Sequence, residues 1–90
     1  MGRVVLEKID KHLGMRIAQA RSEAGLSLEA AAAAIDLTDP AYAALEQGDQ
    51  RVSAFVLANL SRLFGRTIGW FYEGLPGQSA FVGAPKSSSV

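Results

Sequence analysis

The chain has 90 residues, which is enough for one small domain and too few for two. It contains no cysteine, and this excludes disulfide bonds, thiolate-bound metals and cysteine nucleophiles. Nine basic residues balance nine acidic ones, whereas proteins that bind DNA mainly through its phosphates usually carry a basic excess. Any electropositive surface must therefore come from the placement of particular side chains.

We expect a cytoplasmic protein that has no contact with a membrane. No segment approaches the roughly 18 consecutive apolar residues of a membrane-spanning helix. The first ten residues, MGRVVLEKID, lack the long apolar stretch of a secretory signal.

A long amphipathic helix is predicted from about Val4 to Ala24. Apolar residues recur in it at spacings of three and four, which places them on one helical face. These residues are Ile9, Leu13, Ile17, Ala20 and Ala24. Gly14 either weakens this helix locally or marks a break between a leader and the first helix of the domain. Gly25 ends the segment, as glycine commonly does after a helix.

Two short helices are predicted next, over residues 28–35 and about 39–47. Each follows a hydroxyl-bearing residue, Ser27 or Thr38, whose side chain can accept a hydrogen bond from an early backbone N–H group. The turn between them contains Asp36, a residue type that tolerates left-handed backbone better than most. The pattern therefore predicts two helices joined by a tight turn.

The second of these short helices is expected to bury Tyr42 and Leu45, and Gly48 lets the chain leave it abruptly. A further helix is predicted over residues 54–64, where Ser53 caps the start and apolar residues cluster again. A short helix or turn over residues 67–73 follows, and it is rich in aromatic residues. No pattern of alternating residues indicates a β-strand of useful length.

The segment GLSLEAAAAAIDLTDPAYAALEQGDQRVS resembles the Cro and phage-repressor (XRE-type) helix-turn-helix family. Members typically share G-L-S-Q-E-x-L-A, a short turn, and S-x-x-x-I-S-x-x-E-x-G. The matching residues are Gly25, Leu26, Ser27, Glu29, Ala32, Ile35, Leu37, Thr38, Tyr42, Leu45, Glu46 and Gly48. The resemblance extends over about residues 13–74, most of the chain, and looks like a subgroup known from alphaproteobacteria.

The resemblance implies an all-α fold, a compact five-helix phage-repressor-like domain with a flexible C-terminal tail. We expect an N-terminal helical leader at residues 1–12 and the helix-turn-helix domain at residues 13–75. From Pro76 the composition changes to Gly, Pro, Ser and Ala, so residues 76–90 are expected to form a disordered tail.

A helix-turn-helix pair can present its second helix to the DNA major groove while the first helix crosses the backbone. The resemblance thus implies a small transcriptional regulator that binds double-stranded DNA as a homodimer. The candidate DNA-binding residues are Thr38, Asp39, Ala43, Ala44, Gln47, Arg51, Arg16 and Arg21.

Each candidate also has a purely structural interpretation. Thr38 can serve only as a helix cap, and Asp39 suits the first turn of a helix because of the helix dipole. Gln47 can be a solvated end residue, and Arg51 can pair within the molecule. Arg16 and Arg21 can lie on a solvated helix face, and Glu46 is expected to make an internal polar bond.

Base readout is expected to be weak or atypical. None of the residues that the second helix would turn to the groove can form the bidentate Arg–guanine or Asn/Gln–adenine pairs that discriminate bases. These residues are Asp39, Pro40, Ala41, Ala43 and Ala44. Leu28 stands where the family usually has a glutamine that reaches a phosphate.

The alternative function is a helix-turn-helix fold that has lost DNA binding and modulates a DNA-competent protein partner. The alanine-rich helices favour this alternative, because small side chains allow close helix packing. Trp70, Phe71 and Tyr72 are candidates for a dimer or partner interface, since aromatic residues often anchor interfaces; they can equally be core.

We do not expect an enzyme. The single histidine, His12, has no second ligand at metal-binding spacing, and a solvated or partly packed side chain is its expected role. No glycine-rich phosphate loop and no serine-nucleophile motif are present. Neither a cofactor nor a metal is predicted.

Overall fold

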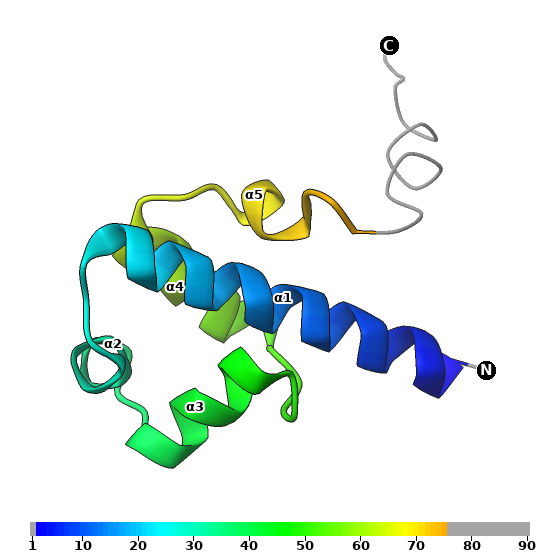
Figure 1. Ribbon diagram of the computed structural model, residues 1–90, viewed down its shortest axis with the longest axis horizontal. Coiled ribbons are helices and arrows are strands. Elements are labelled where there is room, and N and C mark those ends of the chain that lie inside the picture. The colour runs from blue at the N-terminus through cyan, green and yellow to red at the C-terminus, as the bar shows by residue number, and fades with distance from the viewer. Residues whose placement is uncertain (1, 76–90) are drawn as a thin grey trace, which may run out of the picture.

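The computed structural model of the chain describes residues 2–75, and the side chains of residues 8–75. This part of the chain is all-helical, as predicted, with no β-strand (Figure 1). The helices are α1 (Gly2–Ala24), α2 (Leu28–Ala34), α3 (Asp39–Gln47), α4 (Ala54–Phe64) and α5 (Ile68–Tyr72). The predicted bounds of α3 and α4 are confirmed. The observed α2 ends one residue earlier than predicted, α5 is one residue shorter at each end, and α1 begins two residues earlier.

Helix α1 runs without interruption through Gly14, so the break considered from the sequence is wrong. The proposed division into a leader, residues 1–12, and a domain, residues 13–75, stays a prediction. The expected tail, residues 76–90, lies outside the described residues. Among the helices described, none has the length and apolarity that crossing a membrane requires.

Side-chain hydroxyls cap the N-termini of the four shorter helices. In each case the oxygen accepts a hydrogen bond from the backbone N–H group three residues along, in the first helical turn, where N–H groups generally lack a partner within the helix. The caps and their N···O distances are Ser27 (3.0 Å), Thr38 (3.2 Å), Ser53 (3.1 Å) and Thr67 (3.1 Å). The caps predicted at Ser27, Thr38 and Ser53 are therefore confirmed.

Helix α1 is the element around which the others are arranged. It crosses the middle of Figure 1, with α5 above it, α3 below it and α4 behind it, while α2 packs mainly against α3. One apolar core joins these helices, and Tyr42 and Leu45 belong to it as predicted. The remaining buried members are Leu13, Ile17, Ala20, Ala31, Ala32, Leu57, Leu60, Phe64 and Phe71.

The backbones of α1 and α3 touch where the two helices cross. A Cβ atom added to Gly14 would lie 2.5 Å from the carbonyl oxygens of both Leu45 and Glu46. One added to Gly48, whose φ is +75°, would lie 2.7 Å from the Cα atom of Lys11. Gly14 is thus required because any side chain would push α3 away from α1. Glycine lowers the intrinsic stability of α1, but the contact with α3 depends on it.

We predict that Gly14→Ala destabilises the protein, although alanine favours a helix by about 1 kcal/mol over glycine. The added methyl group overpacks the crossing, which typically costs about 1–3 kcal/mol, and here it meets rigid backbone. Urea unfolding followed by circular dichroism measures the effect.

The matched control is Gly69→Ala in α5, where the added Cβ would meet only the Thr67 hydroxyl, at 3.9 Å. This variant should be neutral or more stable. Equal stability of the two variants would contradict the inferred backbone contact at Gly14.

Candidate functional site

The turn between α2 and α3 holds the two helices of the predicted helix-turn-helix pair in fixed register. Asp36 has a φ of +61°, which confirms the expectation that it tolerates left-handed backbone. The next residue, Leu37, donates its backbone N–H to the carbonyl oxygen of Ala32 at 2.9 Å. The chain therefore enters α3 from a turn that is hydrogen-bonded back onto α2.

Helix α3 has one buried face and one free face. Tyr42 and Leu45 are 0% and 4% exposed and point into the core. On the rest of the helix surface, Thr38, Asp39 and Gln47 are exposed and Ala43 and Ala44 are half-buried; these are the candidates named from the sequence. This face, which we call the free face of α3, carries two alanines and no basic side chain.

The charge of the helix-turn-helix segment is negative. Residues 25–53 contain one basic residue, Arg51, and five acidic ones, namely Glu29, Asp36, Asp39, Glu46 and Asp49. Arg51 is exposed and makes no hydrogen bond or ion pair with the described part of the chain. Asp49 is partly offset by Lys11 of α1, with 3.8 Å between Nζ and Oδ1. Arg51 is thus the cation of this segment that is available to an anionic partner.

Arg21, a second candidate, is engaged inside the molecule. Its Nε and Nη2 atoms donate to the two carboxylate oxygens of Glu46 at 2.6 and 3.1 Å, and Nη1 donates to the carbonyl oxygen of Leu26 at 3.1 Å. The hydrogen bond with Glu46 raises the pKa of Arg21 above its ordinary value. This two-pronged pair joins α1 to α3 and confirms the internal polar bond expected of Glu46.

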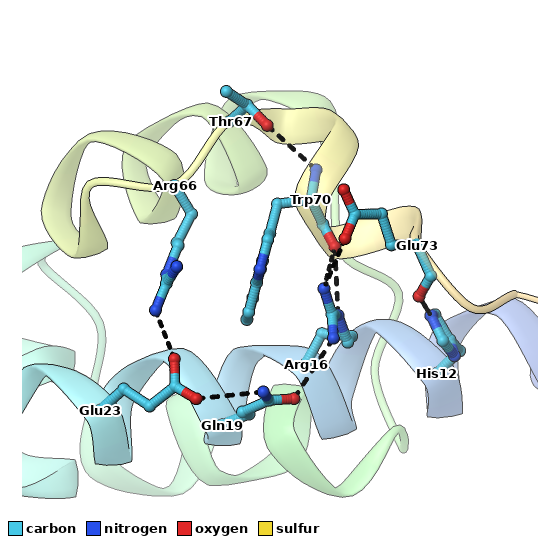
Figure 2. A network of polar contacts seen from close by, with 8 residues as sticks. All are labelled: His12, Arg16, Gln19, Glu23, Arg66, Thr67, Trp70 and Glu73. Atoms are coloured by element: carbon cyan, nitrogen blue, oxygen red, sulfur yellow. Dashed lines mark hydrogen bonds and ion pairs between the residues drawn. The ribbon is translucent and has the colours of Figure 1, made fainter.

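Arg16 is directed to α5 and away from α3. Its Nε and Nη2 atoms donate to the carbonyl oxygen of Trp70 at 3.1 and 2.6 Å. Its guanidinium also stacks on the indole, 3.7 Å from the ring centroid, and Arg66 lies on the opposite side of the ring at 4.7 Å (Figure 2). Trp70 is therefore held between two cations, an arrangement that ring electrostatics favour.

A chain of polar contacts continues from this stack along α1. Arg66 pairs with Glu23, which accepts a hydrogen bond from Gln19 at 3.1 Å (Figure 2). Arg16 lies 3.4 Å from the carboxylate of Glu73, and His12 Nε2 donates to the backbone carbonyl oxygen of Glu73 at 2.8 Å. We missed this network in the sequence, where the spacing of Gln19 and Glu23 by one helical turn was its only visible signal.

The aromatic side chains of α5 pack largely against other residues of the same chain. Phe71 is 0% exposed, and Trp70 packs edge-on against it with 5.2 Å between ring centroids. Tyr72 is half-buried. Ile68 is the large apolar side chain of this helix that is exposed, at 45%. Phe71 thus offers no surface to a partner, and the assignment of these aromatics to an interface stays a prediction.

The basic residues do not gather into one strip beside α3. Arg16 and Arg66 surround Trp70, Arg21 pairs with Glu46, and Arg62 donates to Asn59 on α4. Arg51 alone of the five arginines in residues 8–75 has neither an acidic nor an amide partner there. The described residues therefore offer few cations for phosphate contact.

The hydroxyl of Tyr42 lies in the core near the Arg21–Glu46 pair. Its oxygen is buried and has no hydrogen-bond partner among the described residues. Burial raises the pKa of Tyr42 well above its ordinary value, because ionisation would place an anion in an apolar region, and the carboxylate of Glu46 raises it further. An unpartnered buried hydroxyl destabilises the fold.

Comparison with known proteins agrees with this geometry. A family model described as a helix-turn-helix domain matches residues 12–68. An uncharacterized HTH-type transcriptional regulator of Sinorhizobium medicae is 32% identical over 75 residues, which are 83% of this chain and 54% of that protein. One of Rickettsia prowazekii is 34% identical over 71 residues, 79% of this chain and 55% of that protein. The chain spans about half the length of these relatives.

A solved structure has the same fold. The crystal structure of the clp gene regulator ClgR from Corynebacterium glutamicum superposes with a TM-score of 0.71. The match covers 88% of this chain and 84% of that one, at 23% sequence identity. At this identity the likeness concerns the fold alone.

We predict that Tyr42→Phe raises the free energy of unfolding at pH 7 by about 1 kcal/mol, because it removes a buried hydroxyl that has no partner. It should also reduce the loss of stability in alkali. The pKa of Tyr42 is raised in the folded state, so above pH 10.0, the unfolded value, this tyrosine ionises more readily in the unfolded chain. Its ionisation therefore leaves the free energy of unfolding unchanged at lower pH and lowers it as the pH rises above 10.0.

Urea unfolding at pH 7 and at about pH 11 measures both effects. Tyr72→Phe is the matched control, because its hydroxyl lies on a half-buried side chain. A Tyr42→Phe variant that is less stable than the unmodified protein at both pH values would contradict the inference that the Tyr42 hydroxyl has no hydrogen-bond partner.

Proposed function

Because the chain belongs to an XRE-like helix-turn-helix family, we propose that it is a cytoplasmic DNA-binding transcriptional regulator that acts as a homodimer and reads bases weakly. The observation that carries this proposal is the free face of α3. One side of α3 packs into the core, and the other side carries the exposed Thr38, Asp39 and Gln47 and the half-buried Ala43 and Ala44. A helix held in this way by α1 and α2 can enter a major groove without rearrangement.

The start of α3 is the assigned contact with the DNA backbone. The oxygen of Thr38 accepts from the N–H group of Ala41, so its own O–H group remains able to donate to a phosphate. Gln47 and Arg51, both exposed, are assigned to phosphates at the other end of the helix. Arg16 and Arg21 instead have positioning roles, since their guanidinium groups are engaged with α5 and α3.

Base contacts are assigned to Asp39, at the start of the free face, and to Ala43 and Ala44 in its middle. Ala43 and Ala44 can touch thymine methyl groups, and Asp39 can accept a hydrogen bond from the amino group of cytosine. These contacts discriminate less than bidentate pairs, each of which contributes about 1–3 kcal/mol. The acidic side chains of residues 25–53 further lower the affinity for a phosphate backbone. Weak readout by each copy is thus the expected behaviour.

A homodimer compensates for weak half-sites. Once one copy is bound, the second contact is intramolecular, and the combined affinity exceeds that of either half. The chain carries zero net charge, so two copies do not repel each other over long range.

We predict weak binding to a random-sequence duplex with a shallow salt dependence, because Arg51 supplies few phosphate contacts. Arg51→Gln should weaken binding to all sequences alike and reduce the slope of log K against log salt by about one per copy. Fluorescence anisotropy at about 50 and 200 mM salt measures both quantities.

Arg66→Gln is the matched control, since it also removes one positive charge, but from beside Trp70 on the α5 side of α1 (Figure 2). It should leave the salt slope unchanged once circular dichroism shows that it is folded. Failure of the folded, unmodified chain to bind at the lower salt would overturn direct DNA binding and leave the protein-binding alternative.

A further inference from the structure

An open groove lies between the α2–α3 turn and α4. We call it the α4 groove, and its volume is about 690 Å³. Ile35, Asp36 and Leu37 line its turn wall, and Phe55, Asn59 and Arg62 line its α4 wall. The groove exists because α2 packs mainly against α3, so its C-terminal end stands apart from α4.

The α4 wall presents an exposed aromatic side chain. Phe55 is 76% exposed, more than Met15 (58%) or Ile68 (45%), the other exposed large apolar residues in the described chain. Phe55, Asn59 and Arg62 are spaced by four and three residues, so they form one stripe along α4. Phe55 is continuous with the apolar lining of the groove, and contiguous exposed apolar surface is typical of an association site.

We propose that the α4 groove is where a second copy of this chain docks, with the two-fold axis running along the groove. Such an axis sets each wall of one copy against the opposite wall of the other. Phe55 then packs against Ile35 and Leu37 of the second copy, and Arg62 faces its Asp36. This proposal deepens the homodimer of the proposed function and rests on it.

Self-complementarity selects a second copy as the occupant. One surface carries both a projecting aromatic group and an apolar hollow, and both a cation and an anion on facing walls. A two-fold pairing satisfies all four features at once, whereas an unrelated partner would have to match each separately. The aromatic residues of α5, the other candidate interface, offer little free surface. Phe71 is buried, and Trp70 is enclosed by Arg16 and Arg66.

Sedimentation equilibrium of the full chain without DNA tests the proposal, over chain concentrations of about 1–200 µM. We expect a dimer whose dissociation constant rises by about thirtyfold or more in Phe55→Ser, as for a central aromatic anchor. Arg62→Glu should raise it about tenfold, since it places two acidic groups opposite each other. Ile68→Ser and Met15→Ser are the matched controls and should leave it unchanged.

All four side chains are at the surface, so circular dichroism should show unaltered helices. A monomer at every concentration would overturn the proposal. So would a dimer that Ile68→Ser or Met15→Ser weakens and Phe55→Ser does not, because the interface would then lie elsewhere. The measurement contains no DNA, so loss of DNA binding with an intact Phe55-dependent dimer would count against the proposed function alone.

Cross-linking identifies the facing walls directly, since the natural chain has no cysteine. Ala34→Cys lies on the turn wall and Asn59→Cys on the α4 wall. A mixture of these two single-cysteine chains, treated with a short bismaleimide, should give the mixed dimer in preference to either like pair. Replacing Ala34→Cys by Ala30→Cys, which is exposed but outside the groove, should abolish that preference. The proposed arrangement would be overturned if Asn59→Cys formed the mixed dimer equally well with Ala34→Cys and with Ala30→Cys.

Discussion

The contact between the backbones of α1 and α3 is the constraint on which the rest of the structure depends. Gly14 allows the two helices to touch, and the Arg21–Glu46 pair on the same two helices fixes their rotation. Since α3 is only nine residues long, it would be marginal as an isolated helix. Its direction relative to the core is therefore set by α1, and so is the identity of the face that it leaves free.

Positioning α3 in this way engages charged groups that would otherwise be available to a ligand. Arg21 is held by α3, and Arg16 and Arg66 are held around Trp70, where they attach α5 to the other side of α1. The arginines thus stabilise a rigid frame, and the free face of α3 carries mainly small or acidic residues. This distribution of charge explains why we propose a regulator that depends on two copies to bind usefully.

The same packing decides which apolar surface remains for association. The aromatics of α5 fill the monomer, while Phe55 and the α4 groove remain open to solvent. A protein of this size buries a limited fraction of its surface, so further apolar burial between copies adds stability that the monomer lacks. Within our two proposals, the free face of α3 serves DNA and the α4 groove serves a second copy.

Local chemistry in the sequence determined the helices, because capping hydroxyls, glycines and apolar spacing act over a few neighbouring residues. This is why the caps at Ser27, Thr38 and Ser53 and the left-handed Asp36 were predictable, as was the burial of Tyr42 and Leu45. Features that depend on contacts between residues far apart in the sequence were decided by the tertiary structure alone. It made Gly14 a crossing point, joined Arg16 to Trp70 across 54 residues, and left Arg51 without a partner in the described chain. Composition and spacing do not predict these contacts. Whether an arginine is solvated or paired depends on which carboxylate or aromatic ring the folded chain places beside it.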